Sequence, residues 1–221
     1  MLPNRAFTIH PSKDTIHSIV ILEREFYMTF LSMTIYAIVS SFTPGPNNIM
    51  SLYYSKQTGL RGTIKFCIGV ALGFFLLLLV SNFFSNTLYH VFPKVQLYMK
   101  IFGAIYLLYL AYKIGTSKGT DAQSFSSRYN NIKFGMLLQF INPKGVIYAL
   151  SVVAAFITPN FEHFSVQIIL ITYLALIGFL SSFSWSVFGS IFKKFINEHE
   201  LAFNIIMALL LVYTAISILF T

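Results

Sequence analysis

The chain has 221 residues, of which 56% are hydrophobic and only 10% are charged. Soluble domains are about 45–50% apolar and about 25% charged, so this chain has too few charges to cover a surface that faces water. Its mean hydropathy is +0.72. The composition therefore predicts a membrane protein, and the length leaves no room for a separate soluble catalytic domain.

The formal net charge is +8, which raises the question of a nucleic-acid partner. No basic stripe with interleaved aromatic residues is present, and the basic residues fall almost singly between apolar runs. Positive charge placed in this way is typical of the links between membrane spans. The composition thus favours the lipid bilayer as partner and excludes nucleic acid. The one cysteine, Cys67, lies in an apolar run and is predicted to be a small buried side chain.

Six apolar stretches are each long enough to cross a hydrocarbon core of about 30 Å as a helix. Because lipid offers backbone groups no hydrogen-bond partners, helices are required and the fold is predicted to be all-α. A polar stretch, 115–133, is predicted to be a cytoplasmic loop between a first three-helix half, 28–114, and a second, 134–221. The six spans are 29–52, 64–84, 95–114, 134–157, 166–191 and 201–220.

The distribution of Lys and Arg predicts the orientation. Links one, three and five carry nine of them, with Lys56 in the first link, whereas links two and four carry two. Cytoplasmic links are enriched in Lys and Arg, so both termini are predicted to lie outside. Residues 1–27 hold three of the seven acids and three basic residues that would have to be translocated. We predict that the natural protein starts at Met28, and the alternative of a mostly disordered tail stays open.

The first span is interrupted by the segment Thr43-Pro44-Gly45-Pro46-Asn47-Asn48. Each proline removes a backbone donor and clashes with a carbonyl one turn back. A broken backbone at membrane depth is tolerated only where it is buried in protein or lines a watery cavity. We therefore predict that freed carbonyls and the two amide side chains bind a polar solute. A simple packed kink is the alternative.

The fourth span has a second break, formed by Asn142-Pro143-Lys144-Gly145, with Gln139 one turn earlier. Lys144 is the only basic residue well inside a predicted span. An unpaired ammonium there costs at least about 2.5–3.5 kcal/mol, so it should face a cavity or find a partner. We predict that it attracts a substrate carboxylate, and the alternative is that it reaches toward the interface.

No Asp or Glu lies within the six predicted spans, and Glu200 falls in a link. The charge of Lys144 must then be balanced by the substrate or by carbonyls, or the side chain must be neutral. The spans also lack a nucleophile paired with a base, which argues against an intramembrane enzyme. No metal or other cofactor is predicted.

The two breaks lie at matching places, because Phe42 precedes Phe140 by 98 residues. The third and sixth spans also match at five of twelve positions when Gly103 is aligned with Met207. Three spans per half force the halves into opposite orientations, so the sequence predicts two inverted repeats with broken first and fourth helices and a site between them. Gly69 and Gly73 are predicted to permit close helix packing, and the serines around Trp185 could line a pathway.

These motifs resemble the lysine-exporter (LysE/RhtB-type) translocator family. The resemblance runs from Met28 to the end of the chain. It is carried by residues 42–48, by Gly59, Gly62, Gly69 and Gly73, by Tyr106-Leu107, and by Asn142-Pro143-Lys144. It implies an inner-membrane exporter of amino acids or close derivatives that uses protons as coupling ion.

Many family members carry Asp directly after Pro-Gly-Pro, whereas this chain has Asn47. The missing anion weakens the case for a cationic substrate. The chain looks most like the branch that exports cysteine and O-acetylserine, and a threonine or homoserine substrate stays open, as do a homo-oligomer and a non-transporting accessory protein. The predicted substrate site comprises Thr43, Pro44, Gly45, Pro46, Asn47, Asn48, Gln139, Asn142, Pro143 and Lys144.

Overall fold

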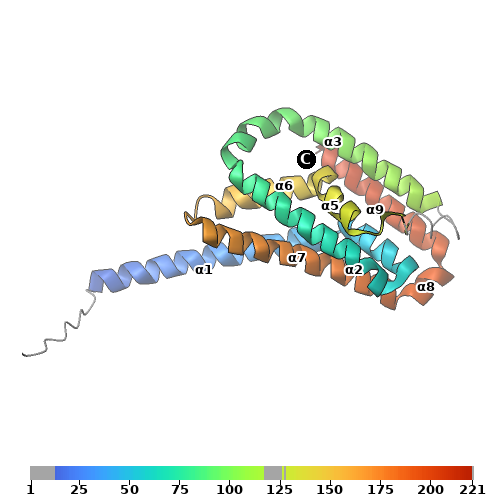
Figure 1. The fold of residues 1–221 in the computed structure, drawn as a ribbon, viewed down its shortest axis with the longest axis horizontal. Coiled ribbons are helices and arrows are strands. Elements are labelled where there is room, and N and C mark those ends of the chain that lie inside the picture. Colours follow the sequence, from blue (N-terminus) through green and yellow to red (C-terminus); the bar gives the residue numbers. More distant parts are fainter. Residues whose placement is uncertain (1–12, 117–125, 127, 221) are drawn as a thin grey trace, which may run out of the picture.

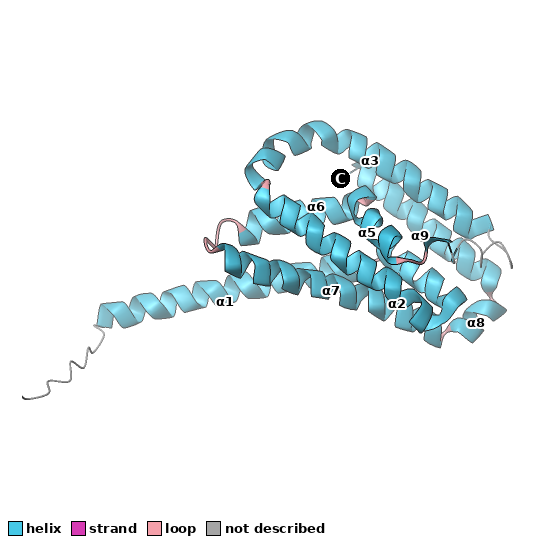
Figure 2. Cartoon of the chain, viewed as in Figure 1, coloured by secondary structure: helices cyan, strands magenta, loops and turns pink. Residues whose placement is uncertain are grey.

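The computed structural model describes residues 13–116, 126 and 128–220, and every regular element in that part of the chain is helical. This confirms the predicted all-α class. Short loops join most of the helices (Figure 2). In chain order the elements are α1 (Lys13–Phe42), α2 (Pro46–Phe83), α3 (Ser85–Thr116), α5 (Ile132–Ile141), α6 (Pro143–Val152), the π-helix η1 (Val153–Ile157), α7 (Phe164–Ile191), α8 (Lys193–Glu198) and α9 (Glu200–Phe220).

Four helical segments of the described chain are long and apolar enough to cross a membrane: α2, residues 96–116 of α3, α7 and α9. The pair formed by α5 and α6–η1 is a fifth candidate, although it is bent by 72° at its break. Large apolar side chains such as Phe102 and Tyr213 stay about two-thirds exposed, as suits a surface that faces lipid. The chain is therefore a multi-pass membrane protein.

The predicted first span, 29–52, is not a single helix. α1 ends at Phe42 and α2 begins at Pro46, then continues past the predicted end of the span. α2 is itself two helices joined at Gly59, whose φ of 76° is the only positive φ in the described chain. Glycine adopts this conformation without steric cost, so the chain can reverse there. The two helices pack on each other, with the rings of Tyr54 and Phe66 5.1 Å apart.

The long α2 lies at the centre of the bundle, where it packs against α7 and α5 (Figure 1). α3 lies beside α9, and α1 packs along α7 with its N-terminal part projecting from the bundle. The Gly59 turn, the C-terminal end of α3 and the short α8 lie at the same end of the molecule. The first and fifth of the links predicted to be rich in Lys and Arg lie there together with the start of the third, and we call it the basic end.

Close packing of α2 on α5 depends on glycines, as predicted for Gly69 and Gly73. A Cβ atom at Gly69 would overlap the backbone of Ile132, and one at Gly73 would lie 2.6 Å from the Met136 carbonyl oxygen. Small residues let two membrane helices approach at backbone distance. This crossing fixes the position of α5, and hence of the second break that follows it.

Gly69→Ala is expected to destabilise the protein by about 1–3 kcal/mol, because overpacking forces the two backbones apart. Gly115→Ala is the matched control, since its Cβ would lie at an ordinary 3.4 Å from the Cβ of Ala208. The melting temperature of each variant is measured in detergent, with size-exclusion chromatography used to quantify the folded protein that remains after heating. Equal melting temperatures for the two variants would show that the crossing tolerates a methyl group.

Candidate functional site

The first break is held open by side chains from two elements. Its residues 43–45 separate α1 from α2, whose first residue is Pro46. The buried Asn48 amide donates to the carbonyls of Ser41, at 2.7 Å, and Thr43, at 3.0 Å. Ser181 of α7 donates to Asn48 Oδ1 at 3.1 Å. Carbonyls left without helical donors where α1 ends thus gain side-chain donors, which is how a broken membrane helix is stabilised.

The second break consists of Asn142, which separates α5 from α6, and Pro143 is the first residue of α6. Asn142 is 3% exposed, and its Oδ1 atom has no hydrogen-bond partner. A buried polar atom without a partner costs about 1–3 kcal/mol. Such an atom in a native protein calls for an explanation, and a bound solute that donates to it is one.

Lys144 connects the two breaks. Its ammonium donates to Thr43 Oγ1 at 2.7 Å, to the Thr43 carbonyl at 3.1 Å and to the Pro44 carbonyl at 3.4 Å. A Cβ atom at Gly45 would lie 3.3 Å from Lys144 Nζ, so the bare glycine leaves room for this side chain. The sequence left three ways to satisfy Lys144: the substrate, backbone carbonyls, or a neutral side chain. In this structure backbone carbonyls accept its hydrogen bonds.

A second bridge between the breaks is formed by two amides. Asn47 Nδ2 donates to Gln139 Oε1 at 2.9 Å, and Gln139 Nε2 donates back to Asn47 Oδ1 at 3.0 Å. Gln139 also donates to the Gly135 carbonyl at 3.2 Å. Segments more than ninety residues apart in sequence are thus joined by both amide and ammonium groups.

A cavity lies between the two breaks. About 50 Å³ of it admits the centre of a water molecule, which is room for roughly three to five waters. Among the described residues, no Asp or Glu lines it. The lining comprises Ser40, Ser41, Thr43, Gly45, Pro46, Asn47, Asn48, Val70, Phe74, Gln139, Asn142, Lys144, Gly145, Tyr148, Gly178, Ser181 and Ser182.

Eight of the ten predicted site residues line this cavity. The other two, Pro44 and Pro143, shape the breaks from outside the lining. Two serines of α7, Ser181 and Ser182, also line the cavity. The sequence suggested that serines near Trp185 line a polar pathway, but it did not place them in the substrate site. Trp185 donates to the Phe42 carbonyl at 3.3 Å, so it caps the first break.

One prediction about charge is wrong. Lys56 was expected in an exposed link, but it lies within α2 and is 1% exposed, so Lys144 is not the only basic residue inside the bundle. Its ammonium pairs with Glu200, which was also placed in a link and instead begins α9. The first span was predicted to end at residue 52, whereas the helix that begins at Pro46 continues to the turn at Gly59.

The comparisons with known proteins agree with these motifs. The family model described as LysE type translocator matches residues 38–221, which include both breaks and the whole cavity. The chain belongs to this family. The match confirms the family that the sequence motifs resemble, and it makes the protein a translocator instead of an enzyme.

Two curated relatives are named cysteine/O-acetylserine efflux protein. The one from Salmonella typhimurium is 32% identical over 186 residues, covering 84% of this chain and 94% of the relative. The one from Escherichia coli is 30% identical over 185 residues, with the same coverage of both chains. No solved structure matches the chain.

Proposed function

We propose that this LysE-family translocator exports a small neutral amino acid or derivative across the cytoplasmic membrane, of the cysteine and O-acetylserine type or of the threonine and homoserine type. The observation that carries the proposal is the cavity between the breaks. It offers one cation, amide groups and freed carbonyls, and among the described residues no carboxylate lines it. The names of the two relatives support the first substrate type.

The cavity suits both ends of a zwitterion. The substrate carboxylate would take over the ammonium of Lys144, whose present partners are neutral oxygens, because charge-assisted hydrogen bonds are the stronger ones. The substrate ammonium would donate to the free Oδ1 of Asn142 and to carbonyls of the first break. A cationic substrate would bring a second positive charge close to Lys144 without an anion to balance it.

We also propose six spans arranged as two inverted repeats. The first span, read as α1 with the first helix of α2, and the fourth, α5 with α6–η1, are the two broken helices. α1 packs on α7 of the other half, and α5 packs on α2 in return. In the core between α3 and α9, Leu107 and its matched residue Leu211 both lie buried.

Alternating access would then rock one half against the other around the cavity. The basic end is predicted to face the cytoplasm, with both termini outside. Protons as coupling ion stay a prediction, as do the three-helix boundaries, and a homo-oligomer stays open. A non-transporting accessory protein is not favoured by the family match.

The test is efflux of labelled cysteine, O-acetylserine, threonine and lysine from cells that overproduce the protein. We expect faster loss of a neutral amino acid and no change for lysine. Faster loss of lysine alone would overturn the substrate assignment, since it would place a cation beside Lys144. The control is the same cells carrying the empty vector.

A further inference from the structure

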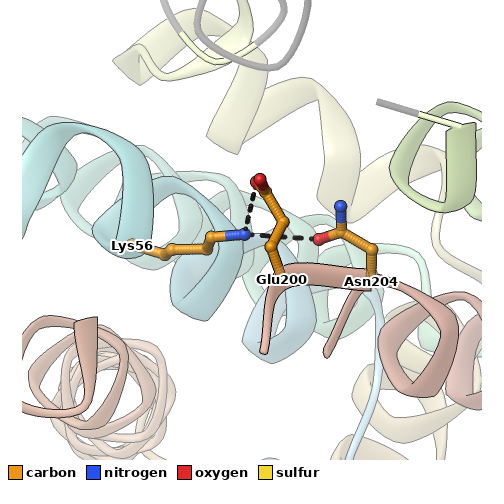
Figure 3. Close-up of polar contacts among 3 residues, drawn as sticks. All are labelled: Lys56, Glu200 and Asn204. Carbon is orange, nitrogen blue, oxygen red and sulfur yellow. Dashed lines mark hydrogen bonds and ion pairs between the residues drawn. The ribbon is translucent and has the colours of Figure 1, made fainter. Parts of the chain in front are cut away.

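Outside the cavity, an ion pair with a buried lysine joins the two halves. Lys56 Nζ lies 2.9 Å from Glu200 Oε1 and donates to Asn204 Oδ1 at 3.5 Å (Figure 3). The ammonium also lies 5.1 Å from the centre of the Phe203 ring. Lys56 is 1% exposed, whereas Glu200 is 39% exposed and stands between it and the surface. The pair joins α2 of the first half to α9 of the second.

A row of buried residues with hydroxyl or thiol side chains, joined partly through backbone carbonyls, leads from the cavity toward this pair. It begins at Ser182, which lines the cavity and whose carbonyl accepts from Ser186 Oγ at 3.1 Å. Ser186 Oγ lies 3.3 Å from Cys67 Sγ, and the Ser186 carbonyl accepts from Ser55. Ser55 directly precedes Lys56, and all the members of the row are at most 1% exposed.

The row points to the basic end. Lys56 follows Asn48 by eight residues on one helix, which places it about 12 Å farther along the axis at 1.5 Å per residue. That distance carries it from the cavity toward the Gly59 turn. Buried serines also serve helix packing, but burying the Lys56 ammonium costs free energy that an apolar side chain of the same size would not, so helix packing alone does not account for it.

We propose that the row is the route of the substrate between the cavity and the basic end, and that the Lys56–Glu200 pair is the gate that closes it. This inference rests on the proposed transport function. The two charges belong to different halves, so a movement of one half against the other separates them and opens the row to water. In this structure the pair is closed.

Cys67 allows a direct test, because it is the only cysteine of the chain and lies in the middle of the row. Its labelling by a membrane-impermeant methanethiosulfonate is measured in inside-out and right-side-out vesicles. Glu200→Gln is expected to speed labelling at least tenfold, and only from the side that the basic end faces. Glu198→Gln changes an exposed carboxylate two residues away and is expected to leave the rate unchanged.

The exchange variant Lys56→Glu with Glu200→Lys keeps a pair of opposite charges and is expected to restore slow labelling. Faster labelling of Glu200→Gln from both sides would indicate general loosening of the fold and would overturn the gate. An unchanged rate in Glu200→Gln, with Cys67 labelled fully after denaturation, would overturn it too. Labelling needs no substrate, so it tests the gate separately from the efflux assay. The gate proposal can therefore be overturned while efflux is still observed, and efflux can be absent while the labelling result supports the gate.

Discussion

Replacing Lys144 with alanine is expected to lower export by roughly 100-fold, to near background, while the protein stays folded in the membrane. A hydrogen bond to a charged group is worth about 1.5–3 kcal/mol, and every 1.4 kcal/mol is tenfold in affinity. The present partners of Lys144 are the oxygens of Thr43 and Pro44, which alanine leaves available to water in the cavity. The substrate carboxylate, in contrast, would lose its only cation in the described lining.

The measurement is the initial rate of efflux, normalised to the amount of protein in the membrane. Lys133→Ala is the matched control, because that lysine is exposed at the start of α5 and lies outside the cavity. It is expected to retain full activity. Full export by Lys144→Ala would contradict the assignment of the carboxylate to this residue.

Asn48→Leu is expected to destabilise the protein by about 1.5–4.5 kcal/mol and to abolish export, because it removes three hydrogen bonds that contribute about 0.5–1.5 kcal/mol each. Leucine has nearly the same shape but cannot donate to the Ser41 and Thr43 carbonyls or accept from the Ser181 hydroxyl. Ser181 still donates to the Ser41 carbonyl and Lys144 to the Thr43 carbonyl, so neither oxygen is left without any partner. Thermal unfolding in detergent and the efflux rate are measured together.

Asn160→Leu is the control for that change. Asn160 is exposed, and its side chain donates to the Phe156 carbonyl at 2.9 Å, so losing this side-chain bond should leave the melting temperature and export almost unchanged. A melting temperature of Asn48→Leu equal to that of the wild type would show that water, and not Asn48, satisfies the carbonyls of the first break.

The breaks and their site could be predicted from sequence because their causes are local. Proline removes a donor wherever it occurs, and a lysine inside an apolar run must find a partner whatever the fold. The partners themselves could not be predicted. Gln139 meets Asn47 across 92 residues, and Ser181 meets Asn48 across 133. Such contacts depend on how helices cross, which no local pattern specifies.

The buried Lys56 shows a different limit. Counting basic residues between apolar runs treats each one as exposed, and this count is right for the exposed Arg61 but wrong for Lys56. The partner that makes burial tolerable, Glu200, lies 144 residues away. The helix continues past Lys56 and turns only at Gly59, which has a positive φ. A glycine permits a positive φ but does not require one, so the position of this turn could not be predicted.

Exchange in liposomes that contain only the purified protein shows directly whether the protein transports a neutral amino acid. Vesicles loaded with unlabelled O-acetylserine, cysteine or threonine are placed in the same labelled amino acid, and its entry is followed. We predict that the label accumulates for at least one neutral amino acid, that Lys144→Ala abolishes the accumulation, and that lysine is not exchanged. Folded protein that exchanges none of the neutral amino acids would rule out the proposed export of a neutral amino acid.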